Sequence, residues 1–131
     1  MLDPDQFQIN EAWIVFKLND TPVSTEADGD FNVLALMDAA SCFILATVFV
    51  STNSLEPSQL ESKRLLKGGY SHKNQFPKIL FIPANQVADI FIKEARHLNI
   101  AVKRVPEENL QVFVDEARQG FQEHVSGGRV Q

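Results

Sequence analysis

The order of apolar runs along the chain is the feature that most constrains its fold. Five short runs rich in strand-forming residues are spaced along the sequence, at residues 12–18, 31–37, 42–50, 78–83 and 100–105. Only turn-type segments, residues 19–30 and 38–41, separate the first three runs. We therefore expect an antiparallel meander in which the second and third strands pair. The 78–83 run is apolar on both faces, which predicts a central position in the sheet.

The period of the pattern changes after the meander, and three helices are expected, at residues 57–67, 85–98 and 107 to about 124. Ser58 and Glu61 have the spacing of a capping box at the start of the first helix, and Gly68-Gly69 is expected to end it. The apolar face of this helix is thin, so we expect it to be half exposed.

The element order is therefore β-β-β-α-β-α-β-α. Strands that alternate with helices are expected to be parallel and joined by right-handed crossovers. The sequence predicts one α/β domain over residues 1–131 with a mixed five-stranded sheet. Residues 1–11 are expected to form a polar lead-in, and residues 126–131 a flexible tail.

Composition narrows the classes of function. The chain has 131 residues, with 12 basic and 17 acidic side chains, for a net charge of −5. This balance disfavours binding to nucleic acid or to an anionic membrane, since both depend on positive charge. No apolar run approaches a membrane span, and no basic leader precedes the first strand. The single cysteine, Cys42, falls in an apolar run, so we expect a buried structural thiol in a cytoplasmic protein.

Three stretches, together with the element order, resemble one superfamily. Trp13 opens the first strand, and residues 36–41 (Leu-Met-Asp-Ala-Ala-Ser) are similar to a turn of the valine-aspartate-x-x-serine type. Pro77 leads into the apolar strand Lys-Ile-Leu-Phe-Ile. Over about residues 12–121 the chain resembles the ribonuclease H-like superfamily, in the form used by integrase and transposase cores.

The resemblance implies where catalytic residues would lie. Such enzymes hold two divalent metals with one aspartate from the first strand and another at the end of the fourth, because hard cations require oxygen ligands. Aligned on Trp13 and Pro77, these positions fall near Phe16 and at Pro83. Neither side chain can bind a metal. The resemblance therefore implies a degenerate, non-catalytic copy that needs no cofactor.

Two clusters of charged residues are alternative sites. The carboxylates that could rebuild a metal site for a metal-dependent nuclease are Asp20, Asp28, Asp30, Asp115 and Glu116. Asp-Gly-Asp is also ordinary turn chemistry, and a solvated helix face is the plainer interpretation of Asp115 and Glu116. The basic side chains that could contact an anion or nucleic acid are Lys63, Arg64, Lys67, Lys73 and Lys78, with Tyr70 or Phe76 available for stacking. A solvated helix end is the plainer interpretation of this segment.

The leading hypothesis is a non-catalytic α/β binding or regulatory module of a bacterial-type cytosolic protein. Its partner would be another protein or a second copy of the chain. We expect the contact along the outer part of the third strand, at residues 47–51, because a sheet edge needs a cover. In the alternative, the N-terminal segment folds over this surface through Phe7 and Ile9 and seals it.

Overall fold

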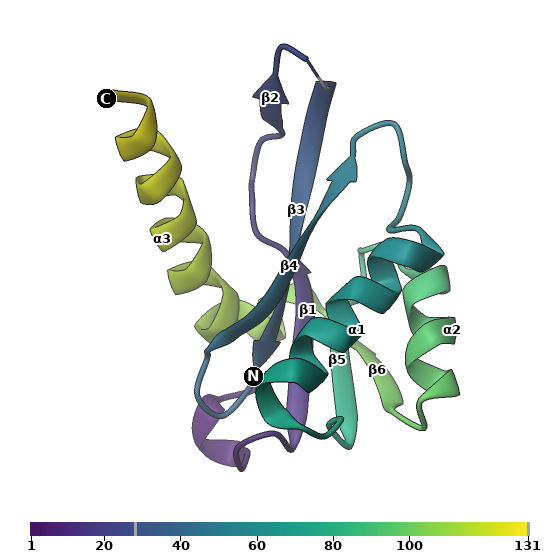
Figure 1. Cartoon of the computed structure of the whole chain (residues 1–131). Coiled ribbons are helices and arrows are strands. Elements are labelled where there is room, and N and C mark those ends of the chain that lie inside the picture. Colours follow the sequence, from purple (N-terminus) through teal and green to yellow (C-terminus); the bar gives the residue numbers. More distant parts are fainter. Residues whose placement is uncertain (28, 131) are drawn as a thin grey trace.

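The structure is a computed structural model that describes residues 1–27 and 29–130, with side chains through residue 123. Its core is a mixed sheet (Figure 1). The strands are β1 (Ala12–Lys17), β2 (Val23–Thr25), β3 (Gly29–Asp38), β4 (Ile44–Ser51), β5 (Ile79–Pro83) and β6 (Ala101–Val105). The helices are α1 (Gln59–Lys73), α2 (Asp89–His97) and α3 (Gln111–Val130), with short 3-10 turns η1 (Pro4–Gln6) and η2 (Glu107–Leu110). The predicted flexible tail, residues 126–131, lies outside the residues whose side chains are described.

The strands lie in the order β4-β3-β1-β5-β6, and β2 extends the β1 side of β3. β3 pairs antiparallel with both β1 and β4, and β5 is parallel to β1 and β6. The predicted α/β domain is confirmed, and so are the antiparallel pairing of the second and third runs and the interior position of residues 79–83. These pairings give the chain a ribonuclease H-like layout.

A sixth strand, β2, corrects the prediction of five. It lies in the segment expected to be only a turn, where Val23, Ser24 and Thr25 pair with Phe31, Asp30 and Gly29. Gly29 has a φ of 81°, a conformation that favours glycine. Between Lys17↔Leu34 and Val23↔Phe31, residues 18–22 face only residues 32–33 across the ladder. The buried Asn19 fills this irregularity, because its Oδ1 accepts a hydrogen bond from the Val33 amide at 2.7 Å.

Helices cover both faces of the sheet (Figure 1). α1 and α2 pack on the face that carries Trp13 and Val15. α3 packs on the opposite face, against Ile14 and Phe16. Alternate residues of β1 therefore enter different halves of the core, as the period of a strand requires, and this explains why residues 12–16 are all apolar.

Gly68 and Gly69 lie inside α1, so the prediction that they end the helix is wrong. α1 ends at Asn74, whose φ is 58° and whose amide donates to the Tyr70 carbonyl. The glycines instead let the helix approach the sheet. A Cβ on Gly69 would lie 2.7 Å from two indole carbons of Trp13, and a Cβ on Gly68 would lie 2.6 Å from the Ala46 Cβ. A glycine pair in a helical sequence thus marked close packing.

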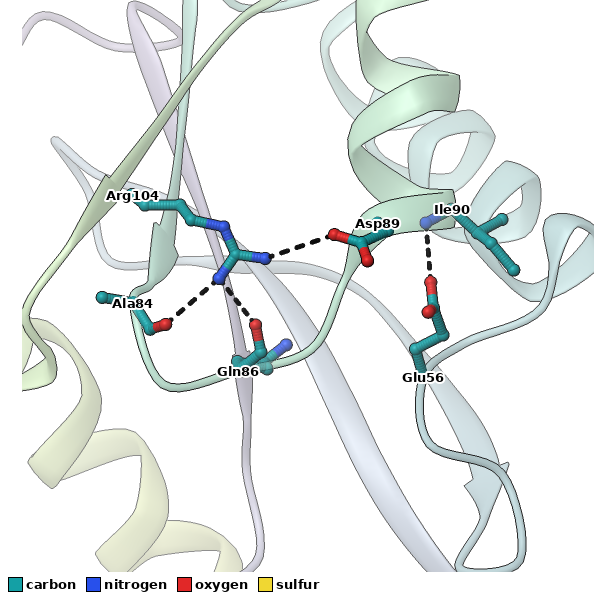
Figure 2. A network of polar contacts seen from close by, with 6 residues as sticks. All are labelled: Glu56, Ala84, Gln86, Asp89, Ile90 and Arg104. Carbon is teal, nitrogen blue, oxygen red and sulfur yellow. Dashed lines mark hydrogen bonds and ion pairs between the residues drawn. The ribbon is translucent and has the colours of Figure 1, made fainter.

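α2 begins at Asp89, four residues later than predicted, and its cap comes from elsewhere in the chain. The N-cap residue Ala88 has no side chain that could accept a hydrogen bond. Glu56, in the loop before α1, accepts from the Ile90 amide at 2.6 Å (Figure 2). A carboxylate at this end is also favoured by the helix dipole.

The N-terminal segment does not seal β4, so that expectation is wrong. Phe7 packs against Phe81 and Phe113, with ring centroids 5.7 and 6.4 Å away, on the face covered by α3. Ile9 is 61% exposed. In the described part of the chain only β3 pairs with β4, which leaves the outer edge of β4 without a neighbouring strand.

None of the helices in the described part of the chain has the length and apolar character of a membrane span.

The close approach of α1 gives the first prediction. Gly69→Ala should destabilise the protein by about 1–2 kcal/mol, because overpacking against the rigid indole outweighs the gain in helix propensity. Gly120→Ala in α3 is the matched control, since nothing lies within 4 Å of an added Cβ there. We expect this control to be neutral or stabilising in urea denaturation. A Gly69→Ala protein as stable as the Gly120→Ala protein would contradict the role assigned to Gly69.

Candidate functional site

The carboxyl ends of β1 and β5 meet at one edge of the sheet. Ile14 and Phe81 are the last register partners of the two strands, and Phe16 and Pro83 each follow two residues further along. Phe16 is fully buried and packs in the core beneath α3. Pro83 offers no polar side-chain atom. The two positions at which the resemblance implies metal ligands therefore lie at the same end of two neighbouring parallel strands, and neither residue present fits a divalent cation.

A cavity of about 430 Å³ opens at this edge. Its lining comes from the ends of β1 and β5, the loops that follow them, η2 and α3: Lys17, Asp20, Leu55, Pro83, Asn85, Gln86, Val87, Glu107 and Arg118. Crevices at the carboxyl ends of parallel strands are the usual binding positions in α/β sheets, which makes this cavity the candidate functional site. It contains two cationic and two anionic side chains.

An ion pair between Glu107 and Arg118 dominates the polar side of the cavity. The Arg118 Nη2 lies 2.6 Å from the Glu107 Oε1, and both side chains are largely buried, with 20% and 31% exposed. The Arg118 Nε donates to the Lys17 carbonyl at 2.9 Å, and its guanidinium lies 5.9 Å from the centroid of the Phe16 ring. Arg118 thus joins α3, η2 and β1 at the point where β1 ends.

The pKa of Glu107 reflects this pairing. Burial alone would raise it, but hydrogen bonds from Arg118 and Asn85 and the positive charges of Arg118 and Lys17 outweigh burial and hold the pKa below its ordinary value. The Asn85 Nδ2 donates to the second carboxylate oxygen at 3.2 Å. Both carboxylate oxygens of Glu107 therefore already have donors, and the group stays ionised at neutral pH.

The loop that carries Asn85 and Gln86 is fixed from β6. Arg104 donates through its Nη1 to the carbonyls of Ala84 and Gln86, at 3.2 and 2.8 Å (Figure 2). Its Nη2 also lies 3.9 Å from the exposed carboxylate of Asp89 at the start of α2. These contacts hold the loop after β5 against the edge of the sheet, so one wall of the cavity is set by a side chain from the next strand.

The candidate carboxylates lie in separate places. Asp20 lines the cavity, and Asp30 is exposed in the β2–β3 hairpin, opposite Ser24. Asp28 lies outside the described residues. Asp115 and Glu116 are exposed on α3, and the charge of Glu116 contributes to the raised pKa of Cys42. Among the described residues no three His, Cys, Asp or Glu side chains are grouped to hold a metal.

Cys42 is half-buried and precedes β4, in a turn where its φ is 59°, so its expected place inside the strand is wrong. Burial, followed by the charges of Glu116, Asp38 and Asp3, raises the pKa of its thiol. A raised pKa keeps the thiol protonated at neutral pH, which is the opposite of what a nucleophile needs.

The basic residues of α1 and the loop after it are mostly on the surface. Lys63, Arg64, Lys67 and Lys78 are exposed, and Lys73 is half-buried. The Lys63 Nζ lies 3.7 Å from the carboxylate of Glu94 in α2. Tyr70 and Phe76 form a ring pair with centroids 4.8 Å apart, and Phe76 also meets the buried Trp13 edge-on. Phe76 is thus half-buried between two aromatic side chains.

Sequence reasoning missed the ion pair at the cavity. At Glu107 the sequence predicts only the start of a helix, where acidic residues are common. Arg118 and its acceptor Lys17 are 101 residues apart in the sequence, and no local pattern links them. The sequence feature that comes nearest to indicating Arg118 is Phe16 at the end of the first strand, since a cation close to an aromatic face is a recurrent arrangement.

Comparison with known proteins identifies the fold alone. No family profile matches the chain, and no curated protein matches it in sequence. The catalytic core domain of BIV integrase superposes with a TM-score of 0.54 at 10% identity, covering 92% of this chain and 72% of that one. A chain of the simian T-cell lymphotropic virus intasome, solved in complex with PP2A regulatory subunit B56 gamma, gives a TM-score of 0.55 at 13% identity. That superposition covers 90% of this chain but only 37% of the viral chain. The ribonuclease H-like fold is thereby confirmed.

The ion pair gives a pH-dependent prediction. Glu107→Gln should lower the free energy of unfolding by about 1 kcal/mol at pH 7, because a charge-assisted bond of a partly buried arginine is lost. The folded pKa of Glu107 is depressed, so the stabilisation is present above the ordinary glutamate pKa and is lost as pH falls through the lower folded value. The difference between wild type and variant should therefore shrink below about pH 4.

The control for this experiment is Glu108→Gln, which removes the same charge from an exposed neighbouring position. Denaturant titrations at pH 7, 5 and 3.5 compare the three proteins. Equal losses for the two variants at pH 7, or a loss in Glu107→Gln that does not change with pH, would show that the pair contributes nothing specific.

Proposed function

We propose that this chain is a non-catalytic ribonuclease H-like domain that acts by binding protein. The observation that carries the proposal is which residues fill the edge of the sheet where β1 and β5 end. Phe16 and Pro83 stand at the implied ligand positions, and Arg118 lies against Phe16 with its charge paired to Glu107. Two-metal phosphodiester chemistry needs several carboxylate oxygens converging on one point. The cavity has only two carboxylates, Asp20 and Glu107, and Glu107 is already paired with the Arg118 guanidinium.

The protein should therefore lack nuclease activity. Purified chain incubated with single- and double-stranded DNA and with RNA, in Mg²⁺ or Mn²⁺, should give no cleavage above a buffer control. An active metal-dependent nuclease serves as the positive control. Cleavage that disappears in Asp20→Asn or Asp115→Asn protein but persists in Glu108→Gln protein would establish a rebuilt carboxylate site and end the proposal.

The expected protein contact lies along the outer edge of β4. Residues 39–55 contain no charged residue and no proline, although charges and prolines are the usual protection of an edge strand. Phe43 and Phe49 are 52% and 65% exposed beside or within this strand. Two identical strands without charge can pair antiparallel around a two-fold axis with no repulsion between like charges. A second copy of the chain is accordingly the proposed neighbour of β4.

Association through β4 predicts that the chain is dimeric at micromolar concentration in sedimentation velocity. Thr47→Lys places a charge on the exposed middle of β4 and should shift the protein toward monomer. Thr52→Lys adds the same charge just beyond the strand and should leave the sedimentation coefficient unchanged. A strictly monomeric wild type, or equal effects of the two lysines, would remove β4 as the contact.

A further inference from the structure

The charge of the chain is unevenly distributed. Residues 62–88 contain five lysines or arginines and no aspartate or glutamate, although the whole chain has 12 basic and 17 acidic residues. Four of these five basic residues lie in α1, which packs beside α2 on one face of the sheet. This positively charged helical surface is a specific local feature, since a net charge of −5 would on average make the surface negative.

A groove of about 390 Å³ lies between α1 and α2. Its apolar lining includes Leu66, Phe76 and the 38% exposed Leu98. Lys63 and Lys67 lie one turn apart along the α1 side, and His97 lies on the α2 side. The groove therefore combines an apolar floor with two lysines along its α1 side.

One carboxylate, Glu94, lies in this groove and is already paired. Its side chain is 7% exposed and lies 3.7 Å from both the Lys63 Nζ and the His97 Nδ1. Glu94 thus contacts side chains from both sides of the groove. Lys67, by contrast, is exposed and has no ion pair in the described part of the chain. The charge available to a partner is therefore that of Lys67, reinforced by the exposed Arg64.

We propose that the groove between α1 and α2 binds an acidic amphipathic segment of another protein, with its apolar side chains on Phe76 and Leu98 and its carboxylates toward Lys67. Charge complementarity selects an acidic partner, and the apolar floor selects one that also carries apolar side chains. A groove between two packed helices accepts a third helix in the same way. A nucleic acid satisfies only the charge, and the net charge of −5 opposes a long polyanion. The inference rests on the proposed protein-binding function and adds a second partner, at a surface separate from the β4 edge.

The test measures binding of a fluorescein-labelled acidic helical peptide, with leucines at helical spacing and glutamates between them, by fluorescence anisotropy. Lys67→Glu should weaken binding about tenfold or more, since close charge pairs at interfaces couple strongly. Lys103→Glu is the matched control, because it makes the same change in net charge at an exposed position on β6. Its register partner Phe81 belongs to the core under α3, which places Lys103 on the opposite face of the sheet. This control should bind within about twofold of wild type.

Two further probes separate the partner classes: the same peptide with lysines in place of glutamates, and a single-stranded oligonucleotide of equal charge. The proposal requires that the acidic peptide alone binds with an affinity that depends on Lys67. Stronger binding of the oligonucleotide would assign the surface to nucleic acid, and equal losses in the two variants would show non-specific attraction; either result overturns the proposal. Absence of peptide binding would overturn it too, while the cleavage and sedimentation experiments would still decide the proposed function separately.

Discussion

The contact between Trp13 and α1 is the constraint on which the rest of the structure depends. The indole is fully buried, and its Nε1 donates to the Asn10 side chain at 2.7 Å, so its position is fixed from one end. At the other end it lies beneath Gly69, where no Cβ fits. α1 can approach the sheet this closely only where it has no side chains, at Gly68 and Gly69. That approach determines how α1 covers β4 and how it meets α2, and therefore where the groove between the two helices opens.

A buried carboxylate extends this constraint to the start of the chain. Asp38 is fully buried at the end of β3 and accepts hydrogen bonds from the Asn10 amide and from the amide and hydroxyl of Ser41. A buried charge is tolerated only with such partners. Because Asn10 also accepts from Trp13, the β3–β4 turn, the N-terminal segment and the α1 contact form one connected network. The turn that carried part of the sequence resemblance is thus a structural anchor.

The sequence predicted the secondary structure correctly where burial produces a regular pattern of apolar residues. The apolar runs of β1, β3, β4 and β5 predicted the strands, and the lengths of the links predicted their pairing. It failed where one pattern serves two physical purposes. Gly68-Gly69 fits a helix end as well as a close contact, and only the position of Trp13 across the sheet distinguishes them. The short β2 has no apolar run, since it is held by pairing at the tip of a hairpin. At the cavity, the candidate Asp20 could be identified by residue type, but the Glu107–Arg118 pair depends on tertiary approach alone.

The Glu107–Arg118 ion pair also limits which substitutions could restore metal-dependent catalysis at this edge of the sheet. Substituting carboxylates at positions 16 and 83 would place them beside Arg118, whose charge would compete with any divalent cation for their oxygens. Removing Arg118 would leave Glu107 largely buried without its cation and would detach α3 from the Lys17 carbonyl. Removing Glu107 would leave the arginine unpaired against Phe16. No single substitution leads from this arrangement to a two-metal site. The same residues that fill the edge of the sheet hold α3 onto it, so at this edge the stability of the fold and metal-dependent catalysis make opposing demands on the chain.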